Sequence, residues 1–110
     1  MQVKFTARRF RAHPDVKAHA VDSVKKLDRF YDGIVTATIV LSYERASNSV
    51  KTAEVILHVY GTVLSAKVKS QEYHKSIDAA VAKLEAQLAR YKAKLRAKDK
   101  SRARALHDKI

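Results

Sequence analysis

The stretch from Ile77 to Leu95 reads IDAAVAKLEAQLARYKAKL. Its large apolar residues recur at steps of four and three, which is the spacing that places side chains on one face of an α-helix. They are Ile77, Val81, Leu84, Leu88, Tyr91 and Leu95. The stretch therefore predicts a long amphipathic helix whose apolar face must pack against another layer of the protein.

Alternating patterns elsewhere predict a sheet for this helix to cover. Apolar and polar residues alternate in four segments that are rich in β-branched residues, at 2–8, 35–44, 52–59 and 63–70. The polar run at 46–49 and the pair Gly61-Thr62 predict short turns between the last three segments. Short turns make consecutive strands antiparallel, so we expect these three to form a meander.

A second helix is expected between the first two strands. Pro14 suits the first helical turn and Asp15 complements the positive end of the helix dipole, whereas His13 is a poor N-cap. Apolar residues then recur at helical spacing until Asp32-Gly33 ends the helix. The order β-α-β-β-β-α predicts an α+β fold, a two-layer sandwich with both helices on one face of a mixed four-stranded sheet.

The size of the chain suits one domain. Its 110 residues can bury a modest core, and we assign the folded domain to 1–95. The segment 96–110 contains six Lys or Arg, two Asp and only isolated apolar residues. We therefore expect a fraying helix end and a mobile basic tail there.

Charge is the strongest signal in the composition. Twenty-three Lys and Arg against 11 Asp and Glu give a formal charge of +12. This balance favours a polyanionic partner, and both nucleic acid and an anionic membrane surface qualify. The sequence has no signal-like start, no cysteine and no apolar run of roughly 18 residues. We expect a cytoplasmic protein with no membrane partner.

The placement of the charge favours nucleic acid. On the long helix, Lys83, Gln87, Arg90 and Lys94 form a second row that can follow a phosphate backbone. The first helix adds basic residues near its end, among them Arg29. If both helices lie on one face, the two basic rows should border a single groove suited to folded RNA. The alternative is a solvated helix face.

No pattern indicates catalysis, a metal or a cofactor. The five His lack the close spacing of a zinc site, and Asp28 and Asp32 are better explained as a surface ion pair or cap. With two Gly there is no phosphate-binding loop, and the eight aromatic residues mostly suit core positions. We expect a non-enzymatic protein with no metal, no cofactor and no small-molecule substrate.

Several motifs match a known family over residues 1–95. They are Met1-Gln2 through Thr6, KLDRFYD at 26–32 with Ile34, Ala53 through Gly61, Ile77-Asp78, Lys83-Leu84, Gln87-Leu88 and KAKL at 92–95. With these motifs the chain resembles the short form of the ribosome hibernation promoting factors, also called ribosome-associated inhibitors or sigma-54 modulation proteins.

The resemblance implies a fold similar to double-stranded RNA-binding domains. It also implies binding in the decoding channel of the small ribosomal subunit, across the tRNA and mRNA sites, which blocks translation and preserves idle ribosomes. By position, the residues facing rRNA would be Lys26, Arg29, Lys83, Gln87, Arg90, Lys92 and Lys94.

The chain departs from the family pattern in two places. His13-Pro14-Asp15 replaces a hydroxyl-type helix start, and Arg8, Arg9 and Arg11 make the preceding loop unusually basic. We expect a monomer off the ribosome, and the tail leaves open whether ribosome dimers are promoted or prevented. A general duplex nucleic-acid binder and a protein adaptor for a sigma factor remain as alternatives.

Overall fold

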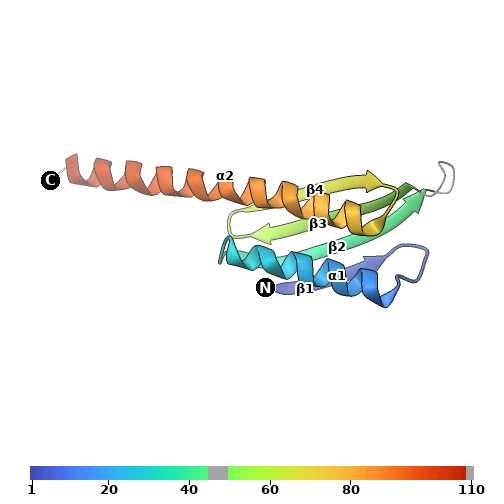
Figure 1. The fold of residues 1–110 in the computed structure, drawn as a ribbon. Helices are drawn as coiled ribbons and strands as arrows, with labels where there is room; N and C mark the ends of the chain where they lie inside the picture. The colour runs from blue at the N-terminus through green and yellow to red at the C-terminus, as the bar shows by residue number, and fades with distance from the viewer. Residues whose placement is uncertain (45–49, 109–110) are drawn as a thin grey trace.

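The chain folds into a four-stranded sheet with two helices packed on one face (Figure 1). This computed structural model describes the backbone of residues 1–44 and 50–108, and the side chains of 1–44 and 50–98. The elements are β1 (Gln2–Ala7), α1 (Pro14–Lys25), the 3-10 turn η1 (Lys26–Arg29), β2 (Ile34–Glu44), β3 (Val50–Val59), β4 (Thr62–Ser70) and α2 (Tyr73–Asp108). The predicted α+β order, β-α-β-β-β-α, is confirmed.

The sheet is mixed, with the strands in the order β1-β2-β3-β4. β1 pairs in parallel with β2, from Gln2 opposite Thr36 to Ala7 opposite Leu41, and the other two pairings are antiparallel. Gly61 turns the chain between β3 and β4 with φ +91, a conformation that L side chains rarely adopt. The polar turn expected at 46–49 lies outside the described residues.

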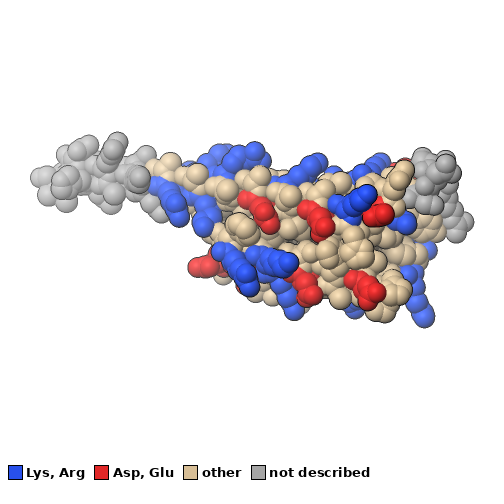
Figure 2. All heavy atoms as spheres, viewed as in Figure 1, with Lys and Arg blue, Asp and Glu red and all other residues tan. Residues whose placement is uncertain are grey.

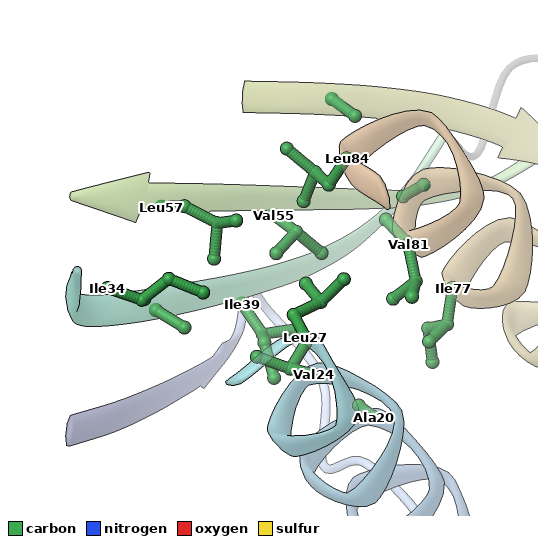
Figure 3. Packing of buried hydrophobic residues seen from close by; sticks show 14 of the residues in the cluster. Ala20, Val24, Leu27, Ile34, Ile39, Val55, Leu57, Ile77, Val81 and Leu84 are labelled. Atoms are coloured by element: carbon green, nitrogen blue, oxygen red, sulfur yellow. The ribbon is translucent and has the colours of Figure 1, made fainter. Parts of the chain in front are cut away.

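The core fills the space between the sheet and the helices. α1 and η1 cover β1 and β2, while α2 covers β3 and β4 (Figure 1). Figure 3 shows Leu27 and Leu84 reaching from the helical layer toward Ile39 and Val55 of the sheet. All four side chains are fully buried, and burying one such side chain stabilises the fold by about 1.5–3 kcal/mol. The apolar row of α2 thus packs on the sheet from Ile77 to Tyr91, as expected, whereas Leu95 at its end is only partly buried.

The first helix differs from the expectation at both ends. The α-helix stops at Lys25, and the chain continues as η1, which still buries Leu27 in the core. At the start, His13 does act as the N-cap, because its Nδ1 accepts a hydrogen bond of 3.1 Å from the backbone N–H of Asp15. A neutral imidazole nitrogen is a hydrogen-bond acceptor, so the ring replaces the usual hydroxyl or carboxylate.

α2 does not end near Leu95 but runs on to Asp108. Residues 96–108 contain neither Gly nor Pro and are rich in Ala, Lys and Arg, which favour the helix. The helix therefore extends further than expected, and the expected fraying of its end stays a prediction. The division into a domain at 1–95 and a mobile tail at 96–110 stays a prediction.

Two aromatic residues depart from the core positions that the sequence suggested. Tyr60 is 72% exposed and Phe30 is 42% exposed. The residues that do pack against the core are Phe5, Phe10, Tyr31, Tyr73 and Tyr91.

Candidate nucleic-acid interface

The predicted row on α2 lies along the side of the helix next to β4. We call Lys83, Gln87, Arg90 and Lys94 the α2 row. The side-chain amide of Gln87 donates a 2.9 Å hydrogen bond to the backbone carbonyl of Ser65 in β4. One helical turn later, the hydroxyl of Tyr91 donates to the backbone carbonyl of Tyr60. These two bonds fix the rotation of α2 and direct the row toward the β4 edge.

A cleft of about 520 Å³ separates this side of α2 from the turn between β3 and β4. Arg90 and Lys94 line it one helical turn apart, together with Gln87, Tyr91, Leu64, Gly61 and Thr62. Neither cation has an ion-pair partner among the described residues. Two unneutralised cations beside a cleft attract anions, because like charges held close together add their fields.

The expectation that two basic rows border one groove was wrong. The groove between α1 and α2 is smaller, about 190 Å³, and Asp78 and Glu85 of α2 line it opposite Lys26. Asp78 also pairs with His19 of α1, at 2.6 Å between Oδ1 and Nε2. Figure 2 shows acidic side chains between the two helices and basic side chains along the opposite border of α2.

The reason for the error is geometric. Periodicity sets the angle between the apolar row and the α2 row, but it does not tell on which side of α2 the first helix will pack. The signal that was available is the seven-residue step from Asp78 to Glu85, which places both acids on one side of α2. That side proves to face α1.

The remaining predicted residues are Lys26 and Arg29 of η1 and Lys92 of α2, and of these Lys26 lines the groove between the helices. Lys92 follows Glu85 by seven residues and so lies on the same side of α2, about 140° round the helix from Gln87. Tyr31, just after η1, makes an edge contact with Tyr91 at 5.8 Å between ring centroids. This contact holds the segment after η1 against α2 at the residue that precedes Lys92. We call Lys26, Arg29 and Lys92 the η1 cluster.

The seven residues therefore form two basic surfaces on the two flanks of α2. The α2 row lies on the β4 side, and the η1 cluster lies on the α1 side. The helix between them is a ridge, and its α1 side carries Asp78 and Glu85 beside the η1 cluster. Among the described residues, the basic side chains therefore do not line one groove, as was expected, but lie beside two separate ones.

The described residues offer little for other chemistry. No group of three or more His, Asp or Glu among them is placed to hold a metal ion. In the same part of the chain, every buried side-chain nitrogen and oxygen has a hydrogen-bond partner. None of the described helices is long and apolar enough to cross a membrane.

Two titratable groups away from α2's basic flanks have shifted pKa values. A 2.9 Å hydrogen bond and the charge of Lys69 lower the pKa of the exposed Glu44 carboxyl. Burial raises the pKa of the Tyr73 hydroxyl, which donates a hydrogen bond to the backbone carbonyl of Ser42. Lys69 accounts for the shift of Glu44, and burial accounts for most of the shift of Tyr73.

Comparison with known proteins places this geometry in context. The family described as "Sigma 54 modulation protein / S30EA ribosomal protein" matches residues 3–96. The ribosome hibernation promoting factor of Klebsiella oxytoca is 30% identical over 96 residues, which are 87% of this chain and 98% of that protein. The factor of the same name from Escherichia coli K12 is 27% identical over the same shares.

Solved structures agree with the observed fold. A ribosomal subunit interface protein from Coxiella burnetii superposes with a TM-score of 0.76 at 22% identity, covering 84% of this chain and 99% of the other. The N-terminal domain of Protein Y from Thermus thermophilus gives a TM-score of 0.71 at 25% identity, covering 83% and 99%. The match over residues 3–96, together with the shared fold, shows that this chain belongs to the Sigma 54 modulation protein / S30EA ribosomal protein family, with the short ribosome hibernation promoting factors.

Proposed function

We propose that this chain binds rRNA of the small ribosomal subunit in the decoding channel, across the tRNA and mRNA sites. In this position it blocks translation and preserves the idle ribosome. The family consists of non-enzymatic binding proteins, and relatives over nearly their whole length are named ribosome hibernation promoting factors. The observation that carries the proposal is the pair of basic flanks on α2.

The charge of the flanks favours folded RNA over an isolated strand. A groove of folded RNA presents two rows of phosphates, and the α2 row and the η1 cluster supply cations for both. Asp78 and Glu85 repel phosphates from the groove between the helices. The ridge of α2 therefore enters the RNA, while the two acids stay outside the contact and Lys26, which lines the same groove, meets a phosphate at its border.

The roles of the seven residues differ within this proposal. Arg90 and Lys94 contact phosphates directly, as do Lys83, Lys26, Arg29 and Lys92. Gln87 uses its amide nitrogen to hold α2 on Ser65, so its contribution is to position the row and its carbonyl oxygen stays available. The partner is the small subunit with its rRNA, the protein is a monomer off the ribosome, and its location is the cytoplasm.

Sedimentation with vacant small subunits tests the proposal. Changing Lys83, Arg90 and Lys94 together to Glu reverses three exposed charges and removes no buried side chain, so the fold should persist. We expect the triple variant to lose ribosome pelleting and translation inhibition. The control is Lys4→Gln, which removes one exposed charge from β1 on the opposite face of the sheet. Pelleting of the triple variant at the wild-type level would refute the site.

A general duplex nucleic-acid binder is the second candidate, and the formal charge of +12 favours it. Such a protein should bind any duplex with equal affinity at matched salt concentration. On B-DNA, each phosphate contact that a substitution removes should reduce the slope of log affinity against log salt concentration by roughly 0.9.

An adaptor for a sigma factor, suggested by the family description, should form a complex that survives nuclease treatment. Preference for the small subunit over matched duplex RNA separates the main proposal from both.

A further inference from the structure

The loop between β1 and α1 exposes three arginines, and hydrogen bonds fix both of its ends. The backbone N–H of Arg8 donates a 2.9 Å hydrogen bond to the carbonyl of Leu41, which extends the pairing of β1 with β2. At the other end of the loop, His13 caps α1. The side chains of Arg8, Arg9 and Arg11 are all exposed. We call these three residues the arginine loop.

An aromatic cluster of Phe10, Tyr43 and Tyr73 holds the middle of this loop. The ring of Phe10 stacks on Tyr73 at 5.2 Å between centroids and 8° between planes, and it meets Tyr43 edge-on at 5.7 Å. Tyr73 is itself fixed by a 3.1 Å hydrogen bond from its hydroxyl to the carbonyl of Ser42. Because Phe10 is anchored on both sides, the arginines that flank it have little backbone freedom.

The backbone of Arg9 is strained. Its φ is +64, and within the described residues it is the one non-glycine residue with a positive φ. This left-handed conformation costs an ordinary L residue free energy that glycine does not lose. A strained residue that the surrounding structure holds in place often marks a functional site. The strain is unexplained if the side chain of Arg9 does nothing.

The three guanidinium groups are also unneutralised. None has a hydrogen bond or ion pair with any residue in the described ranges. Glu44 pairs with Lys69, and Asp15 makes no ion pair with any of the three arginines. Planar guanidinium groups bind phosphate oxygens through two hydrogen bonds at once.

We propose that the arginine loop is a second phosphate-binding site for folded RNA, at the opposite end of the domain from the α2 row. Phe10 packs on Tyr73, the first residue of α2, and Arg90 follows 17 residues later. At 1.5 Å per residue, the loop is about 25 Å from Arg90 along the helix. Figure 1 shows the loop at the end of the sheet where α2 begins.

This inference rests on the proposed function and deepens it. Two sites held in one rigid domain bind a single RNA body more tightly than either alone, because the second contact is intramolecular. The arginine loop therefore contributes to affinity and to the orientation of the domain on the ribosome, and the α2 row cannot replace it.

Arg9→Gly and Arg9→Ala together give a test in which stability and affinity move independently. Both remove the guanidinium, so both should bind vacant small subunits roughly tenfold more weakly than the wild type. Only glycine also relieves the positive φ, so Tm should rise by roughly 3 °C in Arg9→Gly and not in Arg9→Ala. Arg9→Lys keeps the charge but not the two parallel hydrogen bonds of a guanidinium, so its affinity should lie between those of the wild type and Arg9→Ala.

The control is Lys67→Gln, which removes one exposed charge from β4 and should leave the affinity unchanged. If Arg9→Gly binds as tightly as the wild type, the second site is refuted, and the triple change in the α2 row shows whether the proposed function still stands. If Lys67→Gln weakens binding as much as Arg9→Gly, the loss reflects net charge and the site is likewise refuted. If the wild type itself does not bind small subunits, both proposals fall.

Discussion

Phe10 should be far more important for stability than an equally aromatic residue at the surface. Its ring is partly buried against the core and contacts two other rings, on Tyr43 and Tyr73. Replacing Phe10 with alanine removes these contacts and leaves a gap at the start of α2. The matched control is Tyr60→Ala, because the side chain of Tyr60 is 72% exposed.

The structure gives the size of the effect. A buried phenylalanine removes about 150 Å² or more from water, so a partly buried ring removes on the order of 100 Å². At about 25 cal/mol per Å², this burial stabilises the fold by about 2.5 kcal/mol. Each ring–ring contact adds about 0.5–1.5 kcal/mol. With two such contacts, Phe10→Ala should therefore cost about 3.5–5.5 kcal/mol, and Tyr60→Ala should cost less than about 1 kcal/mol.

Thermal unfolding followed by circular dichroism measures both variants. A loss of 1 kcal/mol lowers Tm by about 4–8 °C in a domain of this size, so Phe10→Ala should lower it by roughly 15 °C or more. Tyr60→Ala should lower it by less than about 5 °C. Equal shifts in the two variants would show that the aromatic cluster does not anchor the loop. The three arginines would then not be held in fixed positions.

Three further changes test single contacts. Ser76→Ala removes the buried hydroxyl that donates a 2.8 Å hydrogen bond to the backbone carbonyl of Lys51. Urea unfolding should show that the free energy of unfolding falls by about 1–2 kcal/mol. Lys69→Ala should raise the pKa of the Glu44 carboxyl toward its ordinary value in an NMR titration. Since that pKa is lowered in the folded protein, any stability from the pair exists at neutral pH and disappears as the solution is acidified through it. Gly61→Ala forces a side chain into φ +91 and should cost about 1–2 kcal/mol by thermal unfolding.

Periodicity was sufficient to predict the architecture. The helical spacing from Ile77 to Leu95 and the alternation in four strands require a sheet with one covered face, and the short turns decide its order. Local chemistry was less predictable. The cap at His13 depends on the orientation of one imidazole, and the 3-10 turn at the end of the first helix has no clear signal in the sequence.

The basic surfaces were only half predictable. Lys83, Arg90 and Lys94 do lie in one row, because helical spacing alone determines that. Their distance from Lys26 depends on which flank of α2 faces α1, and this is a property of tertiary packing. The arginine loop was visible only as three basic residues, because the positive φ of Arg9 and the stacked ring of Phe10 appear only in three dimensions.

The extension of α2 to Asp108 also affects how the assembly state can be measured. At 1.5 Å per residue its 36 residues span about 54 Å, and the molecule measures 64 × 25 × 17 Å. Its radius of gyration is 17.3 Å, whereas a compact domain of this length has about 13 Å. An elongated particle elutes from a sizing column ahead of a sphere of equal mass. Calibration against globular standards would therefore report too large a mass for a single copy, so light scattering is the appropriate measurement.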